Sequence, residues 1–273
     1  MEVAEKFIDI KKVIHGKNPR LSEILPGFVI GFIKRLIHQD EVNRIIYTYR
    51  DRHGLEFVRC VLEDMKVTYS VKGLENIPRN GRYIFASNHP LGGFDGLVLM
   101  DAIGEVFPKV RFIVNDILLN LKNFAPLFVP VNKHGRQSAE YARRIDESYS
   151  GDFQILNFPS GLCSRKIKGN ITDLKWNKNF IQKAVRYRRD VVPVYFTGRN
   201  SNFFYGLANL RKFFRIRLNV EMIFLVDEFF RQKGKHFQLT FGEPVSCTLF
   251  DTPKHYSLWA EDIRQRAYAL RDR

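Results

Sequence analysis

The chain has 273 residues, and its hydrophobic fraction of 45% is ordinary for a folded protein with a sizeable core. Lysine and arginine outnumber aspartate and glutamate by 44 to 29, which gives a net charge of +15. Such an excess suits a nucleic acid, an anionic membrane surface or an acidic carrier protein as partner; the alternative is a solvated basic surface with no partner.

Cysteine use and hydropathy exclude several other classes. The three cysteines are widely spaced, so they form neither a disulfide framework nor a paired-cysteine metal site, and we expect a reducing, cytosolic setting. The first residues lack the basic-then-apolar order of a signal peptide, and no apolar run approaches the ~18–20 residues that cross a bilayer. The sequence therefore predicts a protein that is soluble or lies on a membrane without crossing it.

The N-terminal quarter has helical patterns. Residues 21–37 place apolar side chains over much of a helical surface, with Lys34 and Arg35 near the end. This pattern fits an interfacial helix, with its apolar residues in the acyl boundary and its basic residues at the head groups, or a helix packed on the core. Residues 41–66 read as a further pair of helices. We predict a helical, membrane-associating region at 1–66, followed by an α/β domain at 67–273.

From residue 67 onward, short apolar strands alternate with helical patterns. A short strand followed by a turn is expected within 67–78 and again within 237–245, and strands are expected near 83–86, 110–115, 127–131, 153–158 and 191–196. Helices are expected near 96–103, 117–124, 138–149, 177–188, 202–214, 218–232 and 257–271. Alternation of this kind predicts an α/β fold with a mixed, largely parallel central sheet flanked by helices.

The stretch 83–96 carries the first chemical signal. An apolar strand ends just before His89, and the pair Gly92-Gly93 then turns the chain towards Asp95, which stands before an apolar run as an expected helix N-cap. A carboxylate bonded to one imidazole nitrogen fixes the tautomer and leaves the other nitrogen free to take a proton. The alternative is that His89 is a polar loop residue and Asp95 only caps a helix.

Three further strand ends carry cations, and one of them is Thr197-Gly-Arg-Asn200. Ligands of open α/β sheets bind beyond the carboxyl ends of the strands, so we expect these segments near His89. After the strand at 153–158, a Pro/Gly turn precedes three basic residues, which is typical of an anion site; a charged solvated loop is the alternative. The candidate residues after the strand at 153–158 are Pro159, Ser160, Gly161, Arg165, Lys166 and Lys168. Those after the strand at 127–131 are Lys133 and Arg136.

Four short motifs, in the order in which they occur along the chain, resemble those of a known protein family. Val71-Lys-Gly-Leu-Glu-Asn-Ile-Pro78, Ser87-Asn-His-Pro…Asp95, Phe158-Pro-Ser-Gly161 and Val192-Pro-Val194 together resemble the lysophosphatidate and glycerol-phosphate acyltransferase family, over about residues 67–245. More narrowly, the Gly-Gly-Phe-Asp-Gly loop and the segment from Phe158 to Lys166 are similar to a bacterial branch of hemolysin-like acyltransferases. That branch includes O-acyltransferases of amino-acid lipids such as glycine and ornithine lipids.

The resemblance implies a mechanism. His89 would be the general base on an acceptor hydroxyl, Asp95 would orient it, and backbone amides of the glycine-bearing loops would bind the oxyanion. The acyl donor would be a thioester of acyl carrier protein or coenzyme A; no cofactor, metal or acyl-enzyme is implied. The substrate-binding candidates are Asn88, Gly92, Gly93, Lys133, Arg136, Pro159, Ser160, Gly161, Arg165, Lys166 and Lys168. The implied location is peripheral, on the cytoplasmic side of the inner membrane.

Two departures from the family pattern bear on the substrate. Five residues, rather than the usual four, separate His89 from Asp95, and Gly92-Gly93 would have to bulge to keep the hydrogen bond. The usual Phe-Pro-Glu-Gly-Thr-Arg block reads Phe158-Pro-Ser-Gly-Leu-Cys163, so its acid is lost and the basic residue falls later, at Arg165. Because that block is associated with the glycerol-phosphate acceptor, its change favours an acceptor with another head group.

The leading hypothesis is therefore a peripheral membrane O-acyltransferase that acylates a lyso-lipid, with an N-acyl amino-acid lipid as acceptor. Lysophosphatidate acylation and a catalytically idle, lipid-binding member of the fold remain alternatives. A basic nucleic-acid-binding protein is a remote one, because no nucleic-acid module is recognisable and the His/Asp pair would go unused, so we expect no nucleic-acid partner.

Overall fold

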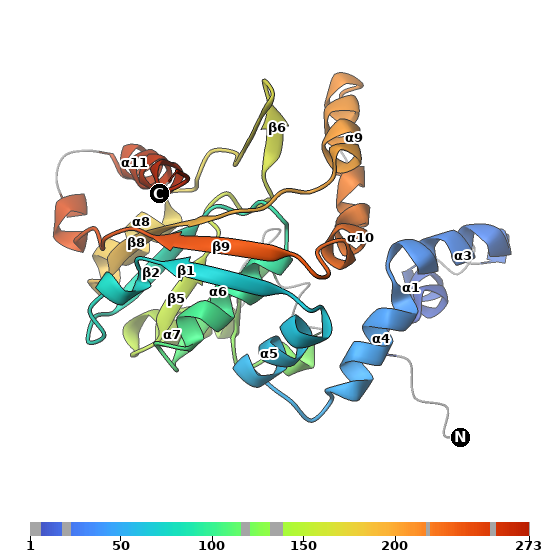
Figure 1. Cartoon of the computed structure of the whole chain (residues 1–273), viewed down its shortest axis with the longest axis horizontal. Helices are drawn as coiled ribbons and strands as arrows, with labels where there is room; N and C mark the ends of the chain where they lie inside the picture. The colour runs from blue at the N-terminus through green and yellow to red at the C-terminus, as the bar shows by residue number, and fades with distance from the viewer. Residues whose placement is uncertain are drawn as a thin grey trace.

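The computed structural model describes residues 7–17, 23–115, 121–131, 139–216, 219–251 and 255–272. These residues form a seven-stranded sheet with helices on both faces (Figure 1). The strand order is β1-β9-β8-β2-β5-β3-β4, and every neighbouring pair is parallel except the antiparallel pair β8–β9. The strands are β1 (Thr68–Lys72), β2 (Tyr83–Ser87), β3 (Val110–Asn115), β4 (Phe128–Val131), β5 (Gln154–Asn157), β8 (Asp190–Phe196) and β9 (His236–Phe241). This confirms the predicted mixed, largely parallel sheet.

Strand β2 lies in the middle of this sheet. All five of its residues are buried, because both faces of the sheet are covered. Phe85 packs into the core cluster on one face, whereas Ile84 and Ala86 pack into the cluster on the other. Burial on both faces explains why the sequence shows an unbroken apolar run here instead of an alternation.

Five helices cover the two faces of the sheet. One face is covered by α5 (Leu55–Asp64) and α6 (Phe94–Gly104), and the other by α7 (Ala139–Ser150), α8 (Asn179–Tyr187) and α11 (Tyr256–Ala269). Every residue of α6 is buried, since this helix is enclosed between the sheet and α5. The His/Asp loop joins β2 to α6, so it lies at the carboxyl edge of the most buried strand.

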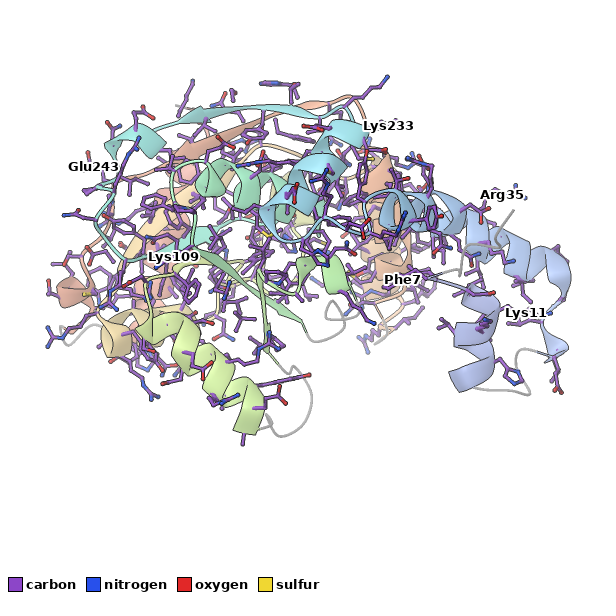
Figure 2. The ribbon with its side chains drawn as sticks, turned by 90° about the horizontal axis from the view of Figure 1, so that it is seen from below. Phe7, Lys11, Arg35, Lys109, Lys233 and Glu243 are labelled. Atoms are coloured by element: carbon purple, nitrogen blue, oxygen red, sulfur yellow. The ribbon has the colours of Figure 1, made fainter. Side chains whose placement is uncertain are left out.

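The N-terminal helices extend beyond the sheet at one end of the molecule. They are α1 (Ile10–Lys17), α3 (Gly27–Leu36) and α4 (Gln39–Thr48), and Figure 2 places Lys11 and Arg35 at this end, far from Lys109 and Glu243. None of the residues of α3 is buried, and Phe28 and Phe32 are 79% and 57% exposed, so α3 does not pack into the core. In contrast, α5 belongs to the main core, and the division at residue 66 stays a prediction.

A smaller unit stands beside one end of the sheet (Figure 1). It comprises a hairpin of β6 (Arg165–Ile167) and β7 (Asn170–Thr172), the helix α9 (Asn202–Phe213), a 3₁₀ turn η4 (Val220–Phe224) and the short helix α10 (Leu225–Phe230). Cys163, Phe204 and Tyr205 form its own small core. The other 3₁₀ turns are η1 (Leu74–Asn76), η3 (Lys122–Phe124) and η5 (Cys247–Asp251).

Several sequence expectations need correction in this unit and near it. The basic segment after the Pro/Gly turn is not a loop throughout but runs into the hairpin, whose turn uses positive φ at Lys168 and Gly169. The helix expected at 218–232 is η4 followed by the short α10. Of the helix expected at 117–124, residues 117–120 lie outside the described residues and the rest is η3.

No helix within the described ranges has both the length and the apolar character needed to cross a membrane.

Candidate active site

His89 and Asp95 form a hydrogen-bonded pair at the end of β2. The distance from His89 Nδ1 to Asp95 Oδ2 is 2.9 Å, and Asp95 is fully buried whereas the imidazole is 14% exposed. The hydrogen bond between His89 and Asp95 therefore forms although five residues separate them, which the sequence alone did not decide. Because Asp95 holds Nδ1, the tautomer with its proton on that nitrogen leaves Nε2 as the basic atom. Nε2 has no partner among the described residues.

The extra residue is absorbed by a loop that wraps around the Asp95 carboxylate. The backbone N–H of Leu91 donates to Oδ2 at 2.9 Å, and those of Gly93 and Gly96 donate to Oδ1 at 3.1 and 3.0 Å. Asp95 is not the N-cap that the sequence suggested, since Gly93 occupies that position and Asp95 lies within the first turn of α6. A carboxylate in the first turn interacts favourably with the helix dipole.

Gly92 is the point at which this loop turns. Its φ is +78°, a region that favours glycine, and a Cβ there would lie 2.7 Å from Cδ2 of Leu225 on α10. Gly93, the next residue, would place a Cβ with nothing within 4 Å. The two glycines are adjacent in sequence but differ in how much space surrounds them.

Gly92→Ala should destabilise the protein by about 1–3 kcal/mol, because its φ becomes strained and Leu225 must move. Gly93→Ala is its matched control and should stay within ~0.5 kcal/mol of the wild type. Urea denaturation of both variants measures the difference. Equal stability of the two would contradict the proposed role of Gly92.

The imidazole of His89 is held on its other sides as well. Its ring stacks on Phe158, with centroids 4.0 Å apart and planes 18° from parallel. The backbone carbonyl of His89 accepts a hydrogen bond from the N–H of Ser164 at 2.7 Å. The segment that begins at the Pro/Gly turn therefore fixes both the ring and the backbone of His89, which confirms that the two motifs meet at one edge of the sheet.

Asp173 is a site residue that sequence reasoning missed. Its Oδ1 accepts the backbone N–H of His89 at 3.2 Å and the hydroxyl of Ser164 at 2.5 Å, and its Oδ2 accepts the indole N–H of Trp176 at 2.9 Å. Burial raises the pKa of this carboxyl, and the hydrogen bonds from Ser164 and Trp176 act against that rise. No spacing in the sequence links Asp173 to His89, since it follows a hairpin that was not predicted.

The Pro/Gly turn lines a cavity of about 500 Å³ next to the residue that stacks on His89. Its lining combines this turn with the segment before α8 and the start of α11: Pro159, Ser160, Gly161, Leu162, Lys175, Trp176, Asn177, Lys178 and Ser257. Within the turn the hydroxyl of Ser160 donates to the carbonyl of Leu162 at 2.7 Å. Lys175 and Lys178 are cations of this cavity that the sequence analysis did not single out.

Arg165 is placed differently from the expected exposed cation. Its side chain is 9% exposed and its guanidinium lies 3.0 Å from Oε1 of the fully buried Glu221, while Arg211 reaches Oε2 at 2.8 Å. Arg165 therefore connects the hairpin to η4 and, through Glu221, to α9, which is a structural role. Its role in substrate binding stays a prediction. Lys168 is exposed at the hairpin turn and Lys166 is half-buried. Lys133 and Arg136 lie outside the described residues.

Asn88 has both ends of its amide engaged by the neighbouring strand. Its Nδ2 donates to the carbonyl of Phe196 at 3.0 Å, and its Oδ1 accepts the N–H of the same residue at 2.7 Å. This pairing closes the carboxyl ends of β2 and β8 against each other. A contact of Asn88 with substrate stays a prediction, and its shown contacts hold the strand end from which His89 projects.

Cys163 lies near the dyad but is not set up as a nucleophile. It is 1% exposed, and burial raises the pKa of its thiol to about 11. The thiolate, which is the reactive form, is therefore disfavoured at neutral pH. Its contacts with Phe204 and Tyr205 give it a packing role instead.

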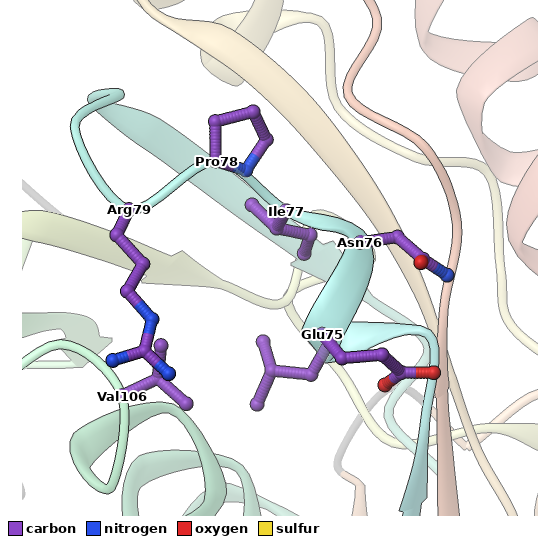
Figure 3. A pocket seen from close by; sticks show the side chains of 7 residues that line it. Glu75, Asn76, Ile77, Pro78, Arg79 and Val106 are labelled. Carbon is purple, nitrogen blue, oxygen red and sulfur yellow. The ribbon is translucent and has the colours of Figure 1, made fainter.

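A second hollow, of about 440 Å³, lies away from this chemistry. It is formed by the turn from Leu74 to Arg79 together with Val106, and Figure 3 shows Arg79 reaching down towards Val106. This turn leads into the amino end of β2, whereas His89 follows its carboxyl end. The hollow is therefore separate from the active-site edge.

Comparisons with known proteins agree with the motifs. The model of an acyltransferase family matches residues 12–273. A lyso-glycine lipid O-acyltransferase of Bacteroides thetaiotaomicron is 42% identical over 97% of this chain and 97% of that protein. An enzyme of the same name from Phocaeicola vulgatus is 40% identical over 97% of this chain and 95% of that protein. The crystal structure of a 1-acyl-sn-glycerophosphate acyltransferase from Thermotoga maritima aligns with a TM-score of 0.49 at 17% identity, over 97% of this chain and 96% of that one. With a family match over nearly its whole length and a His/Asp dyad in place, this chain is an enzyme of the acyltransferase family.

Proposed function

We propose that the protein transfers a fatty-acyl group from a thioester to the hydroxyl of a lyso-glycine lipid, which is an N-acyl amino-acid lipid with one acyl chain. The observation that carries this proposal is the identity of 40–42% to two lyso-glycine lipid O-acyltransferases across 97% of the chain. The dyad of His89 and Asp95 supplies the acid/base group that such a transfer requires.

In the proposed mechanism Nε2 of His89 takes the proton of the acceptor hydroxyl as its oxygen attacks the thioester carbonyl. Asp95 holds the opposite nitrogen and stabilises the imidazolium that forms. The tetrahedral intermediate then collapses, the C–S bond breaks, and the leaving thiolate takes the proton from Nε2. One ester bond forms and one thioester bond breaks, so the step balances without a covalent enzyme intermediate.

The oxyanion needs a donor near the imidazole. Among the loop amides, Leu91 and Gly93 are committed to Asp95, whereas the Gly92 N–H between them has no partner within the described residues. We assign the oxyanion to this amide, because preorganised backbone donors stabilise developing charge most effectively. The role predicted for Gly92 in substrate binding would then be that of an oxyanion donor.

The acceptor carries a carboxylate, and the cavity lined by the turn after Phe158 offers cations for it. Pro159, Ser160 and Gly161 form one wall, and Lys175 and Lys178 bring positive charge. The Phe-Pro-Ser-Gly turn has no acid where the glycerol-phosphate enzymes have glutamate. The missing acid supports an acceptor other than lysophosphatidate, whereas the lysines suit a carboxylate and a phosphate alike. The predicted roles of Lys133 and Arg136 stay proposals.

Donor and location are also proposals. The net charge of +15 suits the acidic acyl carrier protein as well as the phosphates of coenzyme A. Peripheral binding on the cytoplasmic side of the inner membrane is supported by the exposed Phe28 and Phe32 on α3, next to Lys34 and Arg35.

Lipid mass spectrometry of a bacterial host tests the acceptor. The host makes both N-acyl-glycine lyso-lipids and lysophosphatidate, and it carries the wild type or the His89→Ala variant. We expect a gain of one O-acyl group on the lyso-glycine lipid with the wild type alone. A gain confined to phosphatidate would replace this acceptor with the glycerolipid one, and no gain in any lipid with both proteins folded would favour the idle, lipid-binding alternative.

A further inference from the structure

Helix α9 carries an apolar face that is largely exposed, although the ring of Phe203 on this face contacts the ring of Phe224 at a centroid distance of 5.0 Å. Phe203, Leu210 and Phe213 lie on one side of the helix at helical spacing and are 58%, 53% and 79% exposed. The opposite side holds the buried Phe204, Tyr205 and Ala208. Beyond the helix end Phe214 and Ile216 continue the exposed surface, and Ile223 on η4 adds to it. We call these six exposed residues the α9 face: Phe203, Leu210, Phe213, Phe214, Ile216 and Ile223.

The charges around the α9 face have one sign. Lys212 and Arg215 are exposed at its end, and Arg211 beside them is paired to the buried Glu221. The sequence from 199 to 220 contains five arginines and lysines and no aspartate or glutamate. Aromatic and aliphatic side chains with cations at one end match the boundary of an anionic bilayer, where acyl chains meet negative head groups.

The helix beneath this face is held firmly. Glu221 joins Arg211 of α9 to Arg165 of the hairpin, and Ser201 caps α9 by accepting the N–H of Phe204 at 3.1 Å. Glu228 of α10 accepts the N–H of Ser201 at 2.8 Å. These ion pairs and the side-chain cap fix the orientation of α9, so its apolar residues remain on the outer side of the helix.

The α9 face is also linked to the active site and to the N-terminal helices. Leu225, which follows η4, covers Gly92 of the dyad loop. His38, at the junction of α3 and α4, stacks on Phe230 of α10 with centroids 4.5 Å apart and reaches Asp227 at 3.0 Å. Helix α10 therefore contacts both the dyad loop and the junction of the N-terminal helices α3 and α4.

From these observations we infer that the α9 face is a second membrane-contacting surface, separate from α3, which inserts its aromatic residues into an anionic bilayer and brings the dyad loop to the lipid. The inference rests on the proposed function only in that a lipid acceptor gives such contact a use. Membrane contact itself is measured without substrate, so the two can fail independently.

The test measures binding of the full chain to vesicles of phosphatidylglycerol and phosphatidylcholine by sedimentation. The double variant Phe213→Ser/Phe214→Ser should lower the partition coefficient at least about tenfold, because two aromatic residues leave the acyl boundary. Lys212→Glu/Arg215→Glu should weaken binding to the anionic vesicles and leave little salt dependence in what remains. Leu258→Ser is the matched control, since Leu258 is 57% exposed on α11, and its binding should equal that of the wild type.

Three results would overturn the inference. Unchanged vesicle binding of the double variant, with Phe28→Ser/Phe32→Ser alone abolishing it, would leave α3 as the membrane element. A wild-type dimer that the double variant converts to monomer, with vesicle binding retained, would make a second copy the occupant. Lost affinity for acyl carrier protein with vesicle binding intact would make the carrier the occupant.

Discussion

His89→Ala is expected to lower kcat by about 10³-fold while the KM for the acceptor changes little, since general-base catalysis of this kind contributes about 10²–10⁴-fold. The proton taken by Nε2 is transferred only in the transition state, so its loss affects kcat and kcat/KM alike. The measurement is steady-state O-acylation of a lyso-glycine lipid dispersed in detergent, with a fatty-acyl thioester as donor.

His53→Ala provides a matched control for this change. His53 is an exposed histidine in the connection between α4 and α5, so its removal tests the effect of losing an imidazole elsewhere on the surface. It should retain wild-type activity. If His89→Ala kept more than about a tenth of the wild-type kcat, the dyad would not be the catalytic base.

The dyad could be predicted from the sequence because its geometry is local. Strand β2 is buried on both faces, so its apolar run ends sharply where the polar loop begins, and His89 and Asp95 are separated by only five residues. The glycines between them predict a turn, and in the structure Gly92 forms this turn with a φ of +78°. The local sequence did not show whether Asp95 is the N-cap of α6 or a residue of its first turn, because a carboxylate at either position lies near the same backbone amides.

The partners of Arg165 could not be predicted, because they are distant in sequence. Glu221 lies 56 residues away, in a segment that was expected to be one helix but breaks into η4 and α10. That break buries Glu221 against two arginines and turns an expected exposed cation into part of a buried ion pair. The hairpin that carries Arg165 was missed because its strands have three residues each, too few for a pattern of alternation to be visible.

Asp173 was missed for a related reason, and it has a testable role in holding His89. Its carboxylate accepts hydrogen bonds from Ser164, Trp176 and the backbone of His89, and it is 4% exposed. Asp173→Ala would leave these buried donors without an acceptor, at about 1–3 kcal/mol each for those that water cannot reach. We expect the free energy of unfolding to fall by about 3–6 kcal/mol, as measured by urea denaturation, with activity lost in parallel.

Asp173→Asn separates the structural consequence from the loss of charge. Its side-chain oxygen can still accept from Ser164 and His89, but its amide N–H faces the indole N–H of Trp176, so about 1–3 kcal/mol of stability should be lost. Asp146→Ala is the control, since Asp146 is a half-exposed carboxylate paired with Arg186, and its removal should cost less than about 1 kcal/mol. Wild-type stability in Asp173→Ala would show that the carboxylate does not hold the loop. If instead Asp173→Asn stayed folded while its kcat fell together with that of His89→Ala, the charge behind His89 would be needed for catalysis as well as for the fold.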